Sequence, residues 1–452
     1  MSRNSAHSPS RRHCFVPPYL LQQLALAVPE EAERWHRLLA MDDDVRLRRA
    51  QAPGVRRGVA AARGPAWVVH TAGNGSDLPG EGARAAGDPP SDDVAVEEAA
   101  LGISGSLALF SEVYGRDSYD GAGATVSATV HYGQDYVNAL WDGTQLVFGD
   151  GDGRVFDRFT KPVDVLAHEL THAVTEHTAG FVYQGQSGAL HESVSDVFAS
   201  CLKQRLLGQT ALAADWLIGE GLFLPGVQAR GLRDMANPGT AYDDPALGRD
   251  PQPAHLDDYV DTTDDNGGVH LNSGIPNRAF HLAALAIGGS SWEGAGRVWF
   301  AALTGDQVTA RSDFAAFAAA TVAAAASLGD VDVAAVEEAW ARVGVTPASS
   351  PVAPAAAPAA DLLAAADRVV VRRTGGFAGH TSEARVDLGA DPRAGELRDL
   401  VERIDLRRVT GSAPQPDRFV YDFDLCGDQA TLCEQDLTDD LRRVADLVLR
   451  PS

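Results

Sequence analysis

Two histidines whose spacing suits metal binding, His168 and His172, stand in the stretch VDVLAHELTHAVTEHTAG. Residues four apart share one face of a helix, so both imidazoles can bind the same metal ion. Glu169 follows His168 directly and can take a proton from a water that the metal activates, then pass it to a leaving amine. A pair of surface histidines is the alternative, but the HExxH pattern favours catalytic zinc.

Two acids on the next amphipathic segment can supply the rest of such a site. The apolar rhythm of HESVSDVF predicts a helix on which Glu192 and Asp196, four residues apart, share a face. Glu192 can complete a His2Glu site whose fourth position stays open, as catalytic zinc requires. Asp196 can accept a hydrogen bond from a ligand imidazole and fix its orientation. An isolated pair of acids would equally suit a solvated stripe, but next to HExxH the pair favours a zinc site.

The elements that must position these residues are indicated by composition. A basic N-terminal segment covers residues 1–60, and a segment rich in Gly, Val and Tyr, typical of strands and loops, covers 61–160. The pattern over 161–346 is mostly helical, and a Pro/Ala linker follows over 347–361. Residues 362–452 alternate strand and helix patterns, which predicts a small separate α/β domain. We therefore expect an α+β protein with its metal ligands in the helical part.

Charge and hydropathy restrict the class of partner. A formal net charge of −24 argues against nucleic acid, because phosphates would be repelled. No apolar run approaches the roughly 20 residues that span a bilayer, so we expect no membrane partner. Pro17 and Pro18 break the N-terminal apolar stretch, which predicts no Sec signal and a location in the cytoplasm, or secretion by a non-classical route. Four cysteines form no disulfide framework, although Cys426 and Cys433 can pair across a hairpin.

The motifs HELTHAV, GFVYQGQSGALHESVSDVF and DNGGVHLNSGI, in this order and spacing, resemble the thermolysin family of metalloproteases over about residues 66–345. The resemblance implies a catalytic domain of two lobes, with a β-rich N-lobe, a helical C-lobe and the zinc site between them. It also implies one catalytic Zn²⁺ on His168, His172 and Glu192, with Glu169 as the general base in the hydrolysis of internal peptide bonds.

Further roles follow from the same resemblance. Tyr183 and His270 match residues that donate hydrogen bonds to the tetrahedral oxyanion, where preorganised donors matter most, and Asp265 matches the carboxylate that orients the histidine. Asn138 and Ala139 match an edge-strand segment whose asparagine side chain and alanine carbonyl bind the substrate backbone by β-augmentation.

The side of the cleft that receives the leaving group is implied in the same way. Arg233 matches the arginine that grips the substrate carbonyl on this side. The pocket for the residue after the scissile bond maps onto apolar residues, namely Phe156, Phe159, Val165, Ile218 and Leu232. The resemblance therefore implies protein or peptide substrates that are cut on the amino side of bulky hydrophobic residues.

An acidic cluster departs from the pattern of thermolysin, which binds a pair of calcium ions through several acids. Asp164, Asp215 and Glu220 match three of those positions, but Lys203 falls where a shared glutamate would be. We expect the Lys203 ammonium to replace a calcium ion, which argues against a double calcium site and leaves calcium binding open. A surface lysine that extends into solvent is the alternative.

The N-terminal motif Pro17-Pro18-Tyr19-Leu20 resembles the short propeptide of protealysin-like members of this family. A rigid Pro-Pro followed by Tyr and Leu can plug an apolar cleft at small entropic cost, so we expect a zymogen with an intramolecular inhibitor. Cys14 can in principle cap zinc as a thiolate, although an inert thiol is favoured. The basic composition over 56–63 predicts the processing zone.

The C-terminal stretch, from ADRVVVRRTGGFAGHTSEARVDL to LRRVADLVL, resembles emfourin, a small inhibitor of protealysin-like proteases. The resemblance implies an inhibitor-like domain, and its fusion to the protease leads to the hypothesis that it blocks the cleft of its own chain. Two alternatives stay open: a C-terminal domain that recruits substrate, and a catalytically silent zinc-binding protein. The set of Glu169, Tyr183 and His270 favours an active enzyme, because a binding scaffold has no need of a general base.

Overall fold

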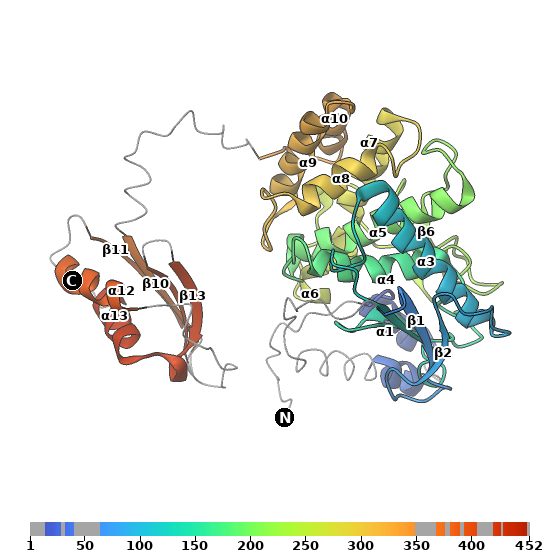
Figure 1. Ribbon diagram of the computed structural model, residues 1–452, viewed down its shortest axis with the longest axis horizontal. Coiled ribbons are helices and arrows are strands. Elements are labelled where there is room, and N and C mark those ends of the chain that lie inside the picture. Colours follow the sequence, from blue (N-terminus) through green and yellow to red (C-terminus); the bar gives the residue numbers. More distant parts are fainter. Residues whose placement is uncertain are drawn as a thin grey trace. The chain divides into compact units, whose positions relative to one another are not determined.

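A computed structural model describes residues 14–28, 32–39, 64–348, 368–375, 380–388, 393–404, 419–425 and 428–449. The chain divides into two compact units, Met1–Ser349 and Ser350–Ser452, and each has its own architecture (Figure 1). The predicted processing zone over 56–63 and most of the predicted linker over 347–361 lie outside the described residues. The segment boundaries drawn from composition therefore stay predictions.

The β-rich lobe of the first unit is a five-stranded sheet that supplies an edge strand to the active site. Its order is β2-β1-β3-β5-β4, in which the three central strands run parallel and both outer strands run antiparallel. Helix α3 (Val94–Tyr114) packs on this sheet and begins at Asp93, whose carboxylate accepts the first free N–H groups of the helix. The strands are β1 (Trp67–Thr71), β2 (Glu81–Ala85), β3 (Val126–Val130), β4 (Ala139–Trp141) and β5 (Leu146–Phe148).

The rest of this unit is helical, and its two central helices carry the predicted metal ligands. Helices α4 (Val163–Glu176) and α5 (Gly185–Leu207) pack along each other, and α4 also contacts the edge strand β4. Polar side chains on such buried helices must find partners inside the protein. Around them lie α6 (Asp265–Asn272), α7 (Gly274–Ile287), α8 (Ala295–Thr304), α9 (Phe314–Leu328) and α10 (Val333–Arg342), with the short strands β6 (Leu217–Ile218), β7 (Arg233–Asp234), β8 (Asp243–Asp244) and β9 (Gly248–Arg249) and the 3₁₀ turn η2 (Leu256–Asp258). The predicted α+β fold, with a β-rich and a helical lobe, is confirmed.

An N-terminal segment packs on these two lobes. Helix α1 (Pro18–Ala27) begins with proline, whose missing N–H removes no helical hydrogen bond at this position. Leu21 and Leu24 of α1 are fully buried and belong to the same hydrophobic core as both lobes. A second helical stretch over 32–39 adds the buried Trp35 to this core. The segment is therefore held by apolar burial over at least two helices.

The second unit is a four-stranded antiparallel sheet with two helices. Its strand order is β11-β10-β12-β13. Val369 and Val371, two apart on one strand, are buried on the same face and pack with Leu397 and Leu441 of the helices. Cys433 is buried, and Cys426, with which it could pair, lies outside the described residues, so this pairing stays untested. The elements are β10 (Arg368–Gly375), β11 (His380–Asp387), α12 (Ala394–Arg403), β12 (Phe419–Leu425), β13 (Asp428–Cys433), η4 (Glu434–Asp436) and α13 (Asp439–Leu449).

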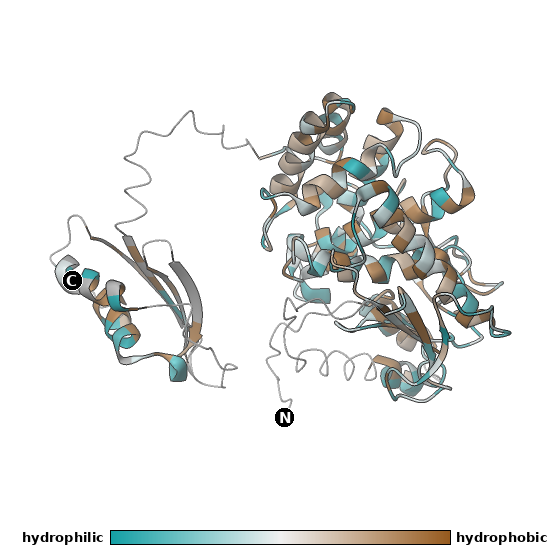
Figure 2. Ribbon diagram, viewed as in Figure 1, coloured by the Kyte–Doolittle hydropathy of each residue, from teal (hydrophilic) through white to brown (hydrophobic). Residues whose placement is uncertain are grey.

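Polar and apolar residues are interleaved along the helices of the first unit (Figure 2). Among the described residues, α3 is long and apolar enough to cross a bilayer by length and composition, but half of its most apolar window is buried inside the fold. Core helices of water-soluble proteins pass the same test, so α3 carries little weight as evidence for a membrane span.

Candidate active site

The two predicted histidine ligands lie one turn apart on α4, inside the protein. Both side chains are fully buried, and their ring centroids are 4.6 Å apart. Glu192 on α5 faces them: its Oε2 lies 3.4 Å from His168 Nε2, and its Oε1 lies 3.7 Å from His172 Nε2. Ligand atoms bound at about 2.0–2.2 Å to a tetrahedral zinc are roughly 3.3–3.6 Å apart. The donor set and its spacing therefore fit one zinc ion.

Burial leaves part of this donor set without hydrogen bonds. Within the described ranges, neither His168 Nε2 nor Glu192 Oε2 makes one, although buried polar atoms normally do. Burial opposes ionisation of Glu192, but the nearby His270 and His168 lower the pKa of its carboxyl to about 2. An anionic carboxylate beside an imidazole nitrogen is the environment that a divalent zinc ion requires.

Asp196, one turn along α5 from Glu192, connects the metal site to the substrate side of the cleft. Its Oδ1 lies 2.8 Å from His168 Nδ1, which turns Nε2 of that ring toward Glu192. The same carboxylate accepts hydrogen bonds from Nε and Nη2 of Arg233 and from Nδ2 of Asn277, each at 2.8 Å. Burial raises the pKa of Asp196, but Arg233 and His168 outweigh it and hold this pKa well below its usual range. One carboxylate thus orients a ligand and anchors a cation.

The second ligand has a partner that the sequence analysis missed. His172 Nδ1 lies 3.0 Å from the hydroxyl oxygen of Ser195, which immediately precedes Asp196 on α5. Both imidazole ligands therefore have an oxygen partner on their Nδ1 side, as ligand histidines usually do. Serine is too common on helices for its type alone to mark such a role, so the packing of α4 on α5 was needed to find it.

Glu169 is fully buried beside the two histidine ligands. The three residues offer ligand atoms that lie within 4.8 Å of one another. Burial raises the pKa of the Glu169 carboxyl to about 7, against the opposing effect of the charge on His168. A carboxyl group that titrates near neutrality is well suited to accept a proton and return it.

Tyr183 and His270 also lie next to Glu192. Tyr183 Oη donates a hydrogen bond to Glu192 Oε1 and lies 3.3 Å from His270 Nε2. Asp265 holds the histidine twice, since its Oδ1 is 2.6 Å from His270 Nδ1 and its Oδ2 accepts the His270 backbone N–H at 2.9 Å. Residues 265–268 all have positive φ, between 51° and 81°. Glycine at 267 and 268 tolerates this left-handed bend, which allows the carboxylate to reach both atoms.

The edge strand and Arg233 bind a segment of the same chain. The N–H of Phe15 donates to the Ala139 carbonyl at 3.0 Å. The N–H of Val16 donates to Asn138 Oδ1 at 2.8 Å, and Asn138 Nδ2 donates to the Val16 carbonyl at 3.3 Å. Arg233 Nη1 donates to the Phe15 carbonyl at 3.2 Å. The residues assigned to the substrate backbone therefore all contact one short peptide segment.

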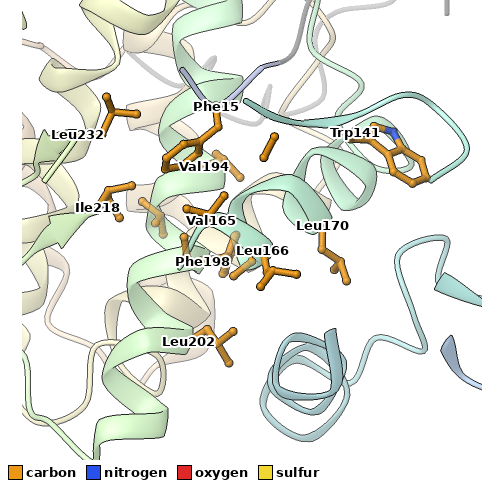
Figure 3. Close-up of a cluster of buried hydrophobic side chains, with 14 of the residues drawn as sticks. Phe15, Trp141, Val165, Leu166, Leu170, Val194, Phe198, Leu202, Ile218 and Leu232 are labelled. Carbon is orange, nitrogen blue, oxygen red and sulfur yellow. The ribbon is translucent and has the colours of Figure 1, made fainter. Parts of the chain in front are cut away.

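The side chain of Phe15 is fully buried in an apolar pocket. Around it in Figure 3 lie the labelled side chains of Val165, Val194, Ile218 and Leu232. The ring meets His168 edge-on with centroids 5.2 Å apart, and the Arg233 guanidinium lies 4.8 Å from its centroid. Phe156 and Phe159 are buried too and pack on each other, 5.9 Å between centroids. Of these residues, the sequence analysis had not included Val194.

The blocking segment is shifted from the motif that the sequence analysis emphasised. Pro17-Pro18-Tyr19-Leu20 was expected to plug the cleft, but Cys14 to Val16 make the central contacts and Pro18 already begins α1. Cys14 approaches the site through its backbone, because its carbonyl oxygen lies 2.9 Å from His270 Nε2. Tyr19 of the motif still lies near the substrate-binding groups, since Asp265 is among the charges that raise its pKa and Tyr19 in turn acts on Arg233. The motif therefore continues the blocking segment into α1.

Lys203 lies inside the acidic cluster. Its ammonium nitrogen is 2.9 and 3.0 Å from the Asp215 carboxylate oxygens, 2.9 Å from Glu220 Oε2 and 3.3 Å from the Leu217 carbonyl. Burial opposes its protonation, but Asp164 and the two bonded acids raise the pKa of Lys203. Burial also raises the pKa of Asp164, to about 6. The ammonium therefore points into the cluster and not into solvent.

Comparison with known families agrees with this geometry. Residues 83–176 match the catalytic domain of thermolysin metallopeptidases, and residues 179–345 match their alpha-helical domain. Residues 371–449 match emfourin.

Similar proteins come from several bacteria. An "Extracellular metalloprotease" of Pectobacterium carotovorum is 53% identical over 61% of this chain and 80% of its own length. "Protease PrtS" of Photorhabdus is 46% identical over 61% of this chain and 76% of its own length. A precursor of protealysin from Serratia proteamaculans has a similar structure, with a TM-score of 0.65 and 45% identity over 74% of this chain and all of that chain.

The expectation of a cytoplasmic location was wrong. The relative that is 53% identical is named an extracellular metalloprotease, and this finding points to secretion. An N-terminal apolar stretch that is interrupted by prolines argues only against a Sec signal peptide. A precursor that is exported by another route does not need that signal.

The buried His2Glu donor set, the neighbouring Glu169 and the matched domains lead to the same conclusion. They set aside the alternative of a catalytically silent zinc-binding protein. This chain belongs to the thermolysin family of zinc metalloendopeptidases, is of the protealysin-like type, and carries an emfourin domain in addition to the peptidase.

Proposed function

We propose that this endopeptidase cuts internal peptide bonds on the amino side of bulky hydrophobic residues. The observation that carries the proposal is the position of Phe15: its ring fills the apolar pocket while Arg233 binds its carbonyl and Ala139 binds its N–H. A substrate residue with the same side chain would bury its ring and make the same two backbone hydrogen bonds. Burial of a phenylalanine side chain is worth about 2–3 kcal/mol, which is enough to select it over a charged residue.

The residues around the bond then divide the chemistry between them. Zinc, when bound by His168, His172 and Glu192, supplies a Lewis acid. Glu169 accepts the proton of the attacking water and returns it to the departing nitrogen. His270, held by Asp265, donates a hydrogen bond to the carbonyl oxygen as negative charge develops on it. Asn138, Ala139 and Arg233 keep the residues after the scissile bond extended and in register. Tyr183 is assigned to the same oxyanion as His270.

A peptide library tests the proposed specificity. Enzyme freed of its N-terminal segment should cut before Phe or Leu on the order of 100-fold faster than before Asp or Lys. Ile218→Ala should weaken this preference, because it removes part of the pocket wall, whereas Leu212→Ala, at a residue 86% exposed, should leave the profile unchanged. Mass spectrometry of the products reads out the cut sites, and a preference for a charged residue after the cut would refute the proposal.

We further propose that the emfourin domain inhibits the peptidase of its own chain. The Pro/Ala linker of about a dozen residues, at about 3.1 Å each, reaches roughly 35–40 Å, which is enough for binding in cis. Short tethers give effective concentrations near millimolar, so an intrinsic Kd near micromolar would keep most sites occupied. Because the Cys14–Val16 segment holds the same substrate-binding groups, this inhibition would follow removal of that segment.

Shortening the chain to end at Thr346 tests this inhibition. The shortened enzyme, once its N-terminal segment is processed, should cleave casein at least tenfold faster than the processed full chain, since the effective concentration of the inhibitor falls to zero. Equal rates would contradict inhibition. A shortened enzyme that is slower on casein but unchanged on a short peptide would favour the alternative, a domain that recruits substrate.

We also propose that the Lys203 ammonium takes the place of a calcium ion. Chelating calcium without removing zinc should then leave the Tm nearly unchanged, and a fall by tens of degrees would contradict the idea. Lys203→Met should destabilise the protein by about 2 kcal/mol, less than a fully buried pair because Glu220 is half exposed. Added calcium should restore part of the Tm of this variant by neutralising the acids left behind. Lys161→Met, at a more exposed lysine, serves as the control.

A further inference from the structure

The polarity of the N-terminal segment in the cleft defines which of its bonds faces the catalytic residues. The Cys14 carbonyl oxygen lies 2.9 Å from His270 Nε2, the histidine assigned to the oxyanion. The N–H of the next residue, Phe15, donates to Ala139, and the Phe15 ring fills the pocket for the residue after the cut. The bond between these two contacts is Cys14–Phe15. We propose that the enzyme hydrolyses this bond in its own chain.

The contacts beyond Phe15 exclude a reversed or slipped register. In a reversed segment, the residue that fills the pocket would present its carbonyl to the edge strand and its N–H to Arg233, which has no acceptor. Here Phe15 does the opposite, with its N–H on Ala139 and its carbonyl on Arg233. Val16 pairs both of its backbone groups with Asn138. A slip by one residue would lose this pairing and withdraw the ring from the pocket, so the segment is bound in the direction and register of a substrate.

The proposed step is ordinary amide hydrolysis and rests on the proposed function. Water oxygen bonds to the Cys14 carbonyl carbon, and the bond from that carbon to the Phe15 nitrogen breaks. Glu169 transfers the two protons of the water, one after the other, to the nitrogen. The products are a carboxylate at Cys14 and an ammonium group at Phe15, so atoms and charge balance without any other co-reactant.

Cleavage at this bond would not empty the cleft. The part of the chain that precedes Phe15 leaves, but Phe15 keeps its ring in the pocket and its carbonyl on Arg233. Beyond it, Leu21 and Leu24 of α1 remain buried in the core, and Trp35 is buried further along. The cleavage product is therefore held as an intramolecular inhibitor, and the same segment serves first as substrate and then as bound product. Activity on other proteins would require a second step that releases α1.

The test follows the amino terminus of the full chain after zinc is supplied to protein purified with a chelator. Intact-mass and N-terminal analysis should find chains that begin at Phe15 before any later amino terminus appears. Their first-order rate should not change when the protein is diluted about 100-fold, because the reaction is intramolecular. Casein hydrolysis should stay low while the Phe15 terminus accumulates. Glu169→Gln should form no such terminus.

A second readout needs no catalysis. In the zinc-free Glu169→Gln chain, the buried Cys14 thiol should resist alkylation, as located by peptide mass mapping. Phe15→Asp should make Cys14 at least tenfold more reactive, because a carboxylate in the apolar pocket expels the segment. Leu26→Asp, at a residue of α1 that is 76% exposed, is the matched control. It should leave the protection of Cys14 unchanged in this chain, and it should leave cleavage unchanged in the chain that keeps Glu169.

The outcomes separate this inference from the proposed function. If the enzyme matures and digests casein but no chain ever begins at Phe15, self-cleavage at this bond is overturned while the proposed function stands. The same holds if another amino terminus always forms first, or if Cys14 reacts equally in the Phe15→Asp and parent chains. If neither self-cleavage nor casein hydrolysis occurs in zinc-loaded protein, both proposals fail together.

Discussion

Replacing Glu169 with Gln should lower kcat on a short peptide by about 10³-fold, because the amide keeps the size of the side chain but does not accept a proton from water. The zinc content should stay near one ion per chain, since Glu192 and not Glu169 faces both imidazole Nε2 atoms at 3.4 and 3.7 Å. Kinetics and metal analysis are to be done on enzyme whose N-terminal segment has been removed by an added protease, since the variant would not process itself.

A matched variant separates the loss of this one carboxylate from a general loss of charge. Glu112→Gln changes a glutamate that is exposed on α3 and pairs with Arg205, so it should leave kcat unchanged. A Glu169→Gln enzyme that kept more than a tenth of the parent kcat would remove Glu169 from its role as general base. If instead the zinc were lost, Glu169 would have to be a ligand.

Asp196→Asn should lower the free energy of unfolding by about 3–5 kcal/mol, because it leaves the Arg233 guanidinium buried without its counter-charge. Both groups are essentially excluded from solvent, with side-chain exposures of 2% for Arg233 and 0% for Asp196. The same change weakens the acceptor for His168 Nδ1, so the zinc dissociation constant should rise about 10–100-fold. Urea unfolding and competition with a chelator measure the two effects.

An exposed ion pair provides the comparison for this prediction. Asp330 pairs with Arg297 at 2.8 Å, but its side chain is 58% exposed. Asp330→Asn should therefore change the free energy of unfolding far less than Asp196→Asn does, and it should leave the zinc affinity as it was. If Asp196→Asn lowered the free energy of unfolding and the zinc affinity no more than Asp330→Asn does, the Asp196 carboxylate would not be needed to hold His168 and Arg233 in place.

The two domains matched by the comparisons show which features could be predicted from local sequence patterns. The α+β fold and the metal-binding elements followed from short-range features, since a helix fixes the relation of His168 to His172 and of Glu192 to Asp196 at a spacing of four residues. The alternation of strand and helix patterns predicted only a small α/β domain. Emfourin was suggested by the resemblance of the C-terminal stretch to that family, which is matched over residues 371–449. The prediction of a cytoplasmic location was wrong because the lack of a recognisable Sec signal is not evidence about where a protein acts.

Contacts between residues distant in sequence had to come from the packing of the chain. Nothing in the order of residues indicates that Phe15 and Val16, and not the proline motif that follows them, lie across Ala139 and Asn138. The pairing of Ser195 with His172 likewise depends on how α5 lies against α4.

The residue types and their spacing along the helices thus predicted the zinc site, because the α-helix has a fixed period. The identity of the peptide in the cleft was decided by tertiary structure alone. Its position is set by where the buried leucines of α1 find apolar surface, and that surface exists only once both lobes have folded.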